Sequence, residues 1–210
     1  SIRNGEVNSR IQKINIDIPE GTVVGIGGLE GQGQRELSKA LFGLSPFTKG
    51  DYMIDGKKVK IHSPSEAIKY KIAYVPEDRK TEGLCLSLSV RENILAMILG
   101  KNAKFGFINK KMEKQETEEG IRQFGIKVNH TGMKVSHLSG GNQQKVVFSK
   151  WIKTKPEILY LNEPTRGVDV QSKLEIYELI RDLTKTGVSV VIFTSDMLEL
   201  IGLSDEIYIM

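Results

Sequence analysis

Residues 138–144 have the sequence Leu-Ser-Gly-Gly-Asn-Gln-Gln and stand at the start of a segment that predicts a helix over residues 143–153. The adjacent glycines Gly140 and Gly141 let a ligand approach the backbone closely, and Ser139 supplies a hydroxyl. The helix that follows directs its unpaired N–H groups and its partial positive charge at the same place. The stretch therefore predicts a site for an anion such as a terminal phosphate, although by itself it also fits a glycine turn with a serine cap.

A second polar stretch follows an apolar strand predicted over residues 158–161. Asn162 and Glu163 come directly after that strand, and Asp169 follows six residues later. In parallel α/β sheets, ligands bind at the carboxyl ends of the strands, where these side chains are expected. A glycine-rich stretch, residues 27–33, follows the strand predicted over 22–26 in the same way. The pattern predicts a binding site at one edge of a sheet.

The order of the predicted elements indicates an α/β fold. Strands are predicted at 14–18, 22–26, 73–75, 158–161 and 188–194, and helices at 36–42, 143–153 and 170–185. This alternation predicts a mostly parallel core sheet, to which residues 51–61 add an antiparallel hairpin turning at Asp55-Gly56. Residues 77–132 are rich in helix formers and show no convincing strand, so they are expected to form an inserted helical lobe. The core, residues 1–76 and about 133–210, then completes one domain.

Composition excludes several classes of protein. No apolar run approaches the ~20 residues that a membrane-spanning helix needs. The net charge is +4, but the lysines are scattered, which argues against a nucleic-acid partner. The single Cys85 excludes an internal disulfide, and the histidines lack the spacing of metal ligands. The chain begins without methionine and ends within a predicted strand, as expected for part of a longer protein.

The motifs together resemble those of ATP-binding cassettes. Residues 138–145 match the family's signature motif, and residues 158–169 match its Walker B strand, catalytic glutamate and D-loop. The resemblance implies a P-loop NTPase-like fold that binds ATP and Mg²⁺. It implies that Glu163 polarises the attacking water and that Asp169 communicates between paired cassettes. Glu77 occupies the Q-loop position, and the implied nucleotide contacts of the signature are Ser139, Gly140, Gly141, Asn142 and Gln143.

Three departures from the family pattern concern the phosphate site. Residues 28–35 match the glycine spacing of the phosphate loop, but Gln34 and Arg35 replace the lysine and the serine or threonine. Asn162 replaces the aspartate that helps to hold Mg²⁺, and Ser195 replaces the switch histidine. Such cassettes work as facing pairs, in which each ATP lies between the phosphate loop of one cassette and the signature of the other. These changes therefore predict that the phosphate site of this chain is degenerate and that its signature completes the ATP site of the partner cassette. The loop positions concerned are Gly28, Glu30, Gly31, Gly33, Gln34 and Arg35.

A subfamily resemblance narrows the expected function. Residues 77–80, 141–144 and 164–169 resemble the C-terminal cassette of fused two-cassette subunits that drive import of ribose, galactose, xylose and similar sugars. The resemblance implies peripheral attachment to the cytoplasmic face of the bacterial inner membrane. Its implied partners are a second cassette, transmembrane permease subunits and, indirectly, a periplasmic sugar-binding protein. A nucleoside or vitamin importer and a soluble cassette protein without a transport role remain alternatives.

Overall fold

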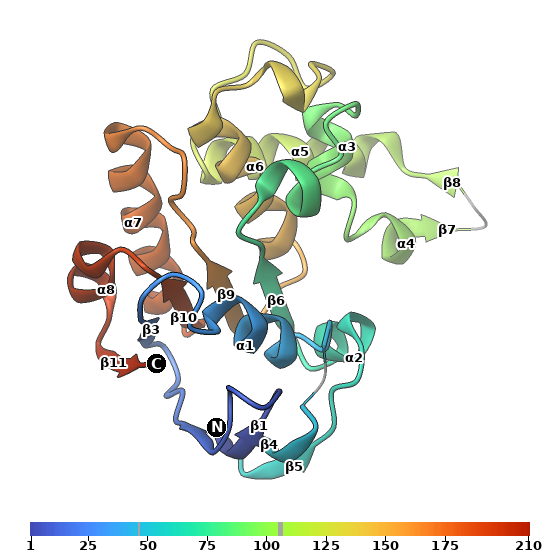
Figure 1. Cartoon of the computed structure of the whole chain (residues 1–210). Coiled ribbons are helices and arrows are strands. Elements are labelled where there is room, and N and C mark those ends of the chain that lie inside the picture. The colour runs from blue at the N-terminus through green and yellow to red at the C-terminus, as the bar shows by residue number, and fades with distance from the viewer. Residues whose placement is uncertain (46, 105–106) are drawn as a thin grey trace. The chain divides into compact units, whose positions relative to one another are not determined.

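The computed structural model describes residues 1–45, 47–104 and 107–210, and the chain divides into two compact units (Figure 1). The sheet unit comprises residues 1–74, 157–164 and 180–210, and the helical unit comprises residues 75–156 and 165–179. The helical unit thus takes in the signature helix and the D-loop in addition to residues 77–132.

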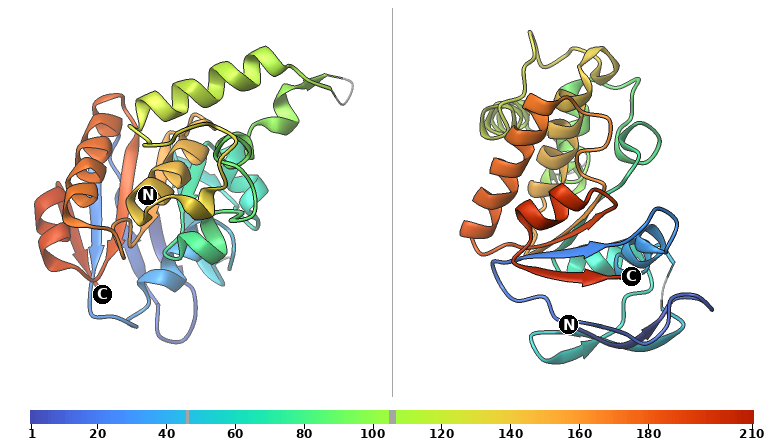
Figure 2. Two further views of the ribbon diagram at one scale, coloured as in Figure 1. Left: turned by 90° about the horizontal axis from the view of Figure 1, so that it is seen from above. Right: turned by 60° about the vertical axis from the view of Figure 1, so that its left-hand side comes forward.

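A parallel sheet forms the core of the sheet unit. Its strands are β3 (Val23–Gly27), β6 (Ile72–Val75), β9 (Ile158–Asn162), β10 (Ser189–Thr194) and β11 (Glu206–Ile209), in the order β11-β3-β10-β9-β6. Strand β10 is parallel to both β3 and β9, with Val190 opposite Val23 and Leu159. Figure 2 shows β3 and β11 side by side. Every residue of β3 and β10 is buried, which explains their almost continuous apolar sequences.

Two helices cover this sheet. Helix α1 (Gln34–Leu41) packs on β9 and β10, and α8 (Met197–Leu203) packs on β3 and β10. The sequence predicted α1 but not α8, which has only seven residues. Asp196 begins α8 by accepting hydrogen bonds from the backbone N–H groups of Leu198 and Glu199, at 2.9 and 3.2 Å.

An antiparallel sheet completes the sheet unit. Its strands are β1 (Ile2–Glu6), β2 (Ile14–Ile16), β4 (Lys49–Ile54) and β5 (Lys57–Val59), in the order β2-β1-β4-β5. The predicted hairpin is confirmed, because β4 pairs with β5 around Asp55-Gly56, both of which have positive φ. Helix α2 (Pro64–Lys69) begins at Ser63, whose Oγ accepts the N–H of Glu66 at 3.3 Å.

The helical unit is built on α3 (Val90–Leu95), α5 (Lys110–Gln123) and α6 (Gly140–Ile152), which pack against one another (Figure 1). Its other elements are η1 (Arg79–Gly83), α4 (Leu99–Asn102), η2 (Val135–His137) and the first part of α7 (Val170–Lys185). The expectation of no strand here was wrong, because β7 (Ala103–Lys104) pairs with β8 (Phe107–Ile108). Two-residue strands are too short to show a periodic pattern.

The predicted α/β class, with a mostly parallel sheet and an antiparallel part, is confirmed. Among the helices that the structure describes, none combines the length and apolar character needed to cross a bilayer.

Candidate functional site

Three polar segments lie at the carboxyl edge of the parallel sheet. The phosphate loop follows β3, Asn162 ends β9 and Glu163 comes directly after it, and Ser195 follows β10. Since β3, β10 and β9 are adjacent, the sheet brings these segments to one edge, as the sequence predicted. This edge is where a nucleotide would lie if the chain held one at its own phosphate loop.

The phosphate loop is closed by its own side chains. The backbone N–H of Leu29 donates to Oε1 of Gln32 at 2.9 Å, and Nε2 of Gln34 donates to the carbonyl of Leu29 at 3.2 Å. Both amide groups converge on Gly28, where a Cβ atom would lie 2.6 Å from each of them. The Gln34 side chain is therefore folded into the loop, and the Leu29 N–H is already engaged by a neutral oxygen.

Arg35 does not take over the position of the missing lysine. Gln34 is only 8% exposed, whereas Arg35 is exposed at the surface of the first turn of α1. Glu30 and Gly31 are also exposed, and Gly33 is buried at the start of the helix with φ of 120°.

Glu163 is held against the end of β10. Its Oε1 accepts the backbone N–H of Ser195 at 2.7 Å, and its own N–H donates to the carbonyl of Phe193 at 2.8 Å. The Thr194 hydroxyl lies 3.5 Å from Oε2 and donates at 2.6 Å to the buried carboxylate of Glu199. Glu163 has φ of 46°, a left-handed conformation that is unusual for a residue with a side chain. The structure therefore brings Glu163 and Ser195 together.

The side chain of Asn162 is poorly suited to bind a metal ion. It is 2% exposed, and its Nδ2 has no hydrogen-bond partner among the residues that the structure describes. A neutral amide also lacks the charge that Mg²⁺ prefers. Together with the lysine and hydroxyl missing from the loop, this donor set does not fit a magnesium-bound nucleotide.

The signature motif begins α6, as predicted, but this helix lies in the helical unit and not with the residues of the predicted core. Ser139 is the N-cap, and its Oγ accepts the N–H of Asn142 at 3.4 Å and the Asn142 amide nitrogen at 3.0 Å. Ser139 is exposed, and the N–H groups of Gly140 and Gly141 lie in the first turn, where helix geometry provides no acceptor. This end of α6 keeps the hydroxyl and the backbone groups that an anion would use.

The amide side chains of the signature have structural partners. Asn142 accepts the N–H of Lys127 through Oδ1 at 2.7 Å. Gln143 is 5% exposed and donates from Nε2 to the carbonyls of Val135 and Leu138, at 3.3 and 3.2 Å. The Gln143 side chain therefore fixes the turn that precedes the helix.

The D-loop ends at the start of α7. Asp169 accepts the backbone N–H and the hydroxyl of Ser172 at 2.9 and 2.8 Å, and these bonds lower its pKa. Glu77, at the Q-loop position, forms an ion pair with Arg166. Arg166 and Arg79 were not identified as site residues from the sequence, because their partners lie far along the chain and in part on the backbone.

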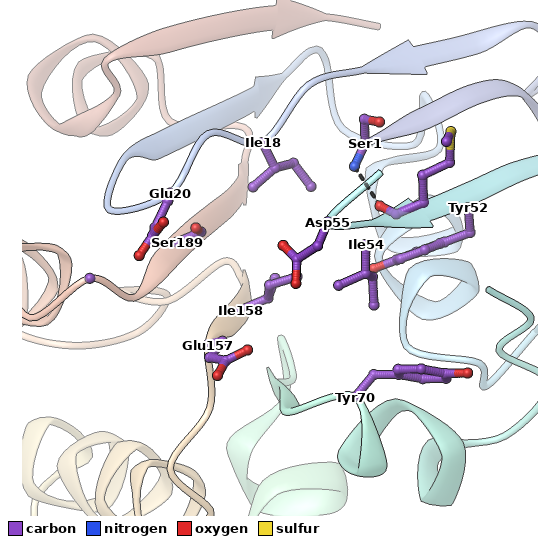
Figure 3. Close-up of a pocket in the computed structure, with 12 residues that line it drawn as sticks. Ser1, Ile18, Glu20, Tyr52, Ile54, Asp55, Tyr70, Glu157, Ile158 and Ser189 are labelled. Atoms are coloured by element: carbon purple, nitrogen blue, oxygen red, sulfur yellow. Dashed lines mark hydrogen bonds between the residues drawn. The ribbon is translucent and has the colours of Figure 1, made fainter. Parts of the chain in front are cut away.

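The cavity in Figure 3 lies at the other edge of the parallel sheet. It measures about 320 Å³ and is bounded by Ile158 and Ser189, the first residues of β9 and β10. The carboxylates of Glu20, Asp55 and Glu157 line it, so it would repel a phosphate group. This cavity is therefore poorly suited to a nucleotide phosphate.

Comparisons with known proteins identify the family of the chain. Residues 11–166 match the family model described as ABC transporter. The chain is 41% identical over its whole length to the ribose import ATP-binding protein RbsA 2 of Burkholderia pseudomallei (strain 1710b), of which it spans 41%. It is 43% identical to RbsA 1 of Rhizobium johnstonii (strain DSM 114642 / LMG 32736 / 3841), again over its whole length and 41% of the relative. The chain thus spans less than half the length of these curated relatives.

Solved structures show the same fold. A nucleotide-free ATP-binding cassette from an ABC transporter is covered to 86%, with all of this chain aligned, a TM-score of 0.84 and 18% identity. A bacterial ABC transporter cassette solved as a dimer is covered to 93%, also with all of this chain aligned, at a TM-score of 0.82 and 22% identity. With its signature, Walker B and D-loop motifs on this fold, the chain belongs to the ABC transporter family of ATP-binding cassettes.

Proposed function

We propose that this cassette completes the ATP site of a partner cassette with its signature motif, while its own phosphate loop does not hold magnesium-bound ATP. The observation that carries the proposal is the contrast between two anion-binding motifs of one chain. The loop at Gly28 is filled by the amides of Gln32 and Gln34, whereas the signature keeps an exposed Ser139 at a helix N-terminus. An ATPase pair of this kind hydrolyses nucleotide at the site whose phosphate loop belongs to the partner.

The transport role is proposed as uptake of ribose or a related sugar. The names of the relatives, which are ribose import ATP-binding proteins, favour this over a nucleoside or vitamin importer. The partners would be a second cassette, the membrane subunits of an importer and, indirectly, a periplasmic binding protein. The cassette would then act at the cytoplasmic face of the inner membrane, attached through those subunits.

Ser139→Arg tests the signature assignment. In the complete ATPase subunit, an arginine side chain at the start of α6 would fill the space that the partner's γ-phosphate needs. We expect ATP hydrolysis to fall by at least about a hundredfold, the scale on which loss of a phosphate-stabilising group acts, while the circular dichroism spectrum stays unchanged.

The matched control is Ser136→Arg, which places the same side chain at an exposed serine outside the signature. This variant should keep full ATPase activity. If Ser139→Arg hydrolysed ATP as fast as the Ser136→Arg control, the signature would not contribute to a working site.

A further inference from the structure

Arg79, the first residue of η1, binds two consecutive carbonyls of the D-loop. Its Nη1 donates to the carbonyl of Arg166 at 2.7 Å, and its Nη2 donates to the carbonyl of Gly167 at 2.9 Å. All three residues belong to the helical unit. A guanidinium presents its N–H groups as a rigid fork, so these two bonds fix the position of the D-loop backbone more tightly than one point charge would.

A second interaction joins residues 77–83 to the D-loop, this time with the cation on the D-loop. Arg166 of the D-loop donates through Nη1 to the carboxylate of Glu77, two residues before Arg79. The Glu77 side chain is 18% exposed and the Arg166 side chain is 55% exposed, so water screens this ion pair in part. Each of the two segments therefore donates hydrogen bonds to the other through an arginine.

The signature lies against the same guanidinium. A Cβ atom at Gly140 would stand 2.8 Å from Nη2 of Arg79 and 3.0 Å from the carbonyl of Gly167. Only glycine leaves room for this approach. Arg79 is thus the point at which residues 77–83, the D-loop and the first glycine of the signature meet.

Residues 77–83 are fixed at both ends. Asp78 accepts the N–H groups of Lys80 and Thr81 at 2.8 and 3.3 Å, which closes the turn. At the other end, Nζ of Lys150 on α6 donates to the carbonyl of Gly83. Hydrogen bonds therefore hold both ends of the segment that contains Arg79.

We propose that Arg79 is a positioning residue that couples residues 77–83 to the D-loop, so that a push on this segment moves the D-loop and the start of the signature together. The proposal rests on the proposed function, because the push would come from the membrane subunit of the importer. Arg79 acts through the two carbonyls and through Gly140.

The first test is hydrogen exchange of residues 165–169 in the complete subunit, with Arg79→Ala and Arg79→Lys compared with Lys80→Ala. Lys80 is exposed and neighbours Arg79 in the sequence, so its alanine variant controls for loss of charge. We expect Arg79→Ala to speed exchange at least about tenfold, because two charge-assisted hydrogen bonds are lost. The exchange rate of Arg79→Lys should lie between those of the wild type and Arg79→Ala, and the rate of Lys80→Ala should equal that of the wild type. Equal exchange in Arg79→Ala and Lys80→Ala would overturn the proposal.

The second test uses the assembled transporter and measures sugar transported per ATP hydrolysed. Arg79→Ala should lower this ratio at least about fivefold and leave the KM for ATP unchanged. A parallel loss of transport and hydrolysis together with a lower melting temperature would indicate a merely structural role and overturn the coupling. If the wild-type assembly moved no sugar, the proposed function would fail, while the exchange measurement would still decide whether Arg79 holds the D-loop.

Discussion

At the scale of single residues, two glutamine side chains close the phosphate loop. The first, Gln34, stands where the family has lysine, and it bends back to the carbonyl of Leu29. The second, Gln32, occupies the N–H of Leu29 that would otherwise face a phosphate. A neutral amide offers no long-range attraction to a triphosphate, so the loop lacks the positive charge of the family's lysine.

Restoring the family residues should restore binding. We expect calorimetry with Mg²⁺-ATP to find at most millimolar affinity for the wild-type chain and affinity at least about tenfold tighter for Gln34→Lys with Arg35→Ser. One unit-charge contact sets an upper bound of roughly a thousandfold. Arg35→Ser alone is the control and should bind as weakly as the wild type. Micromolar binding by the wild type would show that the closed loop still accepts nucleotide.

At the scale of elements, the capping box of α3 connects the sequence directly to local structure. Ser89 and Glu92 have the Ser-x-x-Glu spacing of a capping box, and the structure contains both reciprocal bonds. The N–H of Ser89 donates to the Glu92 carboxylate at 2.8 Å, and the N–H of Glu92 donates to Oγ of Ser89 at 3.2 Å. Hydrogen bonds from the Ser89 hydroxyl and backbone lower the pKa of Glu92 below its ordinary value.

Ser89→Ala should raise the pKa of Glu92 toward its ordinary value, because the hydroxyl bond is the largest cause of the shift. Since the folded pKa lies below the unfolded one, the associated stability is present above the unfolded pKa and is lost as the pH falls through the folded pKa. The melting temperatures of wild type and variant should thus differ most near neutral pH and converge in acid.

Carbon-detected NMR titration of the Glu92 carboxyl group measures the shift. Glu119 serves as an internal control, because its low pKa is due first to a hydrogen bond from Lys153, the C-cap residue of α6. An unchanged Glu92 pKa in Ser89→Ala would show that the hydroxyl bond contributes nothing.

At the scale of the whole molecule, a buried tyrosine pair joins the two sheets of the sheet unit. The hydroxyls of Tyr52 on β4 and Tyr160 on β9 form a hydrogen bond in the interior, and burial raises the pKa of both. Each hydroxyl is the other's partner, so removal of one leaves a buried polar group unsatisfied, whereas removal of both does not.

A double-mutant cycle tests this connection. Tyr52→Phe and Tyr160→Phe should each lower the free energy of unfolding by about 1–3 kcal/mol, and the double variant should cost clearly less than the sum. Urea unfolding gives the three values, and Tyr70→Phe, on a partly exposed side chain, is the control. Additive losses would indicate that the two hydroxyls do not depend on each other.

Much of the fold was predictable because its signals are local. The continuous apolar run of β10 and the amphipathic run of α7 identified both elements, and the predicted bounds of α7, residues 170–185, match the structure. The glycines and Ser139 likewise indicated that a helix starts at the signature. Elements that were missed, such as β1 and α8, are short or depend on neighbours for their burial.

The sequence by itself determined the class of fold, the motifs and their defects, because these depend on residue type and spacing along the chain. Only the tertiary structure decided that Gln32 and Gln34 close the phosphate loop and that Arg79 holds the D-loop. Arg79 is 87 residues from Arg166, and its acceptors there are backbone carbonyls, which every residue possesses. A pattern of side chains in the sequence cannot predict such a contact, because only folding brings those carbonyls within reach of the guanidinium.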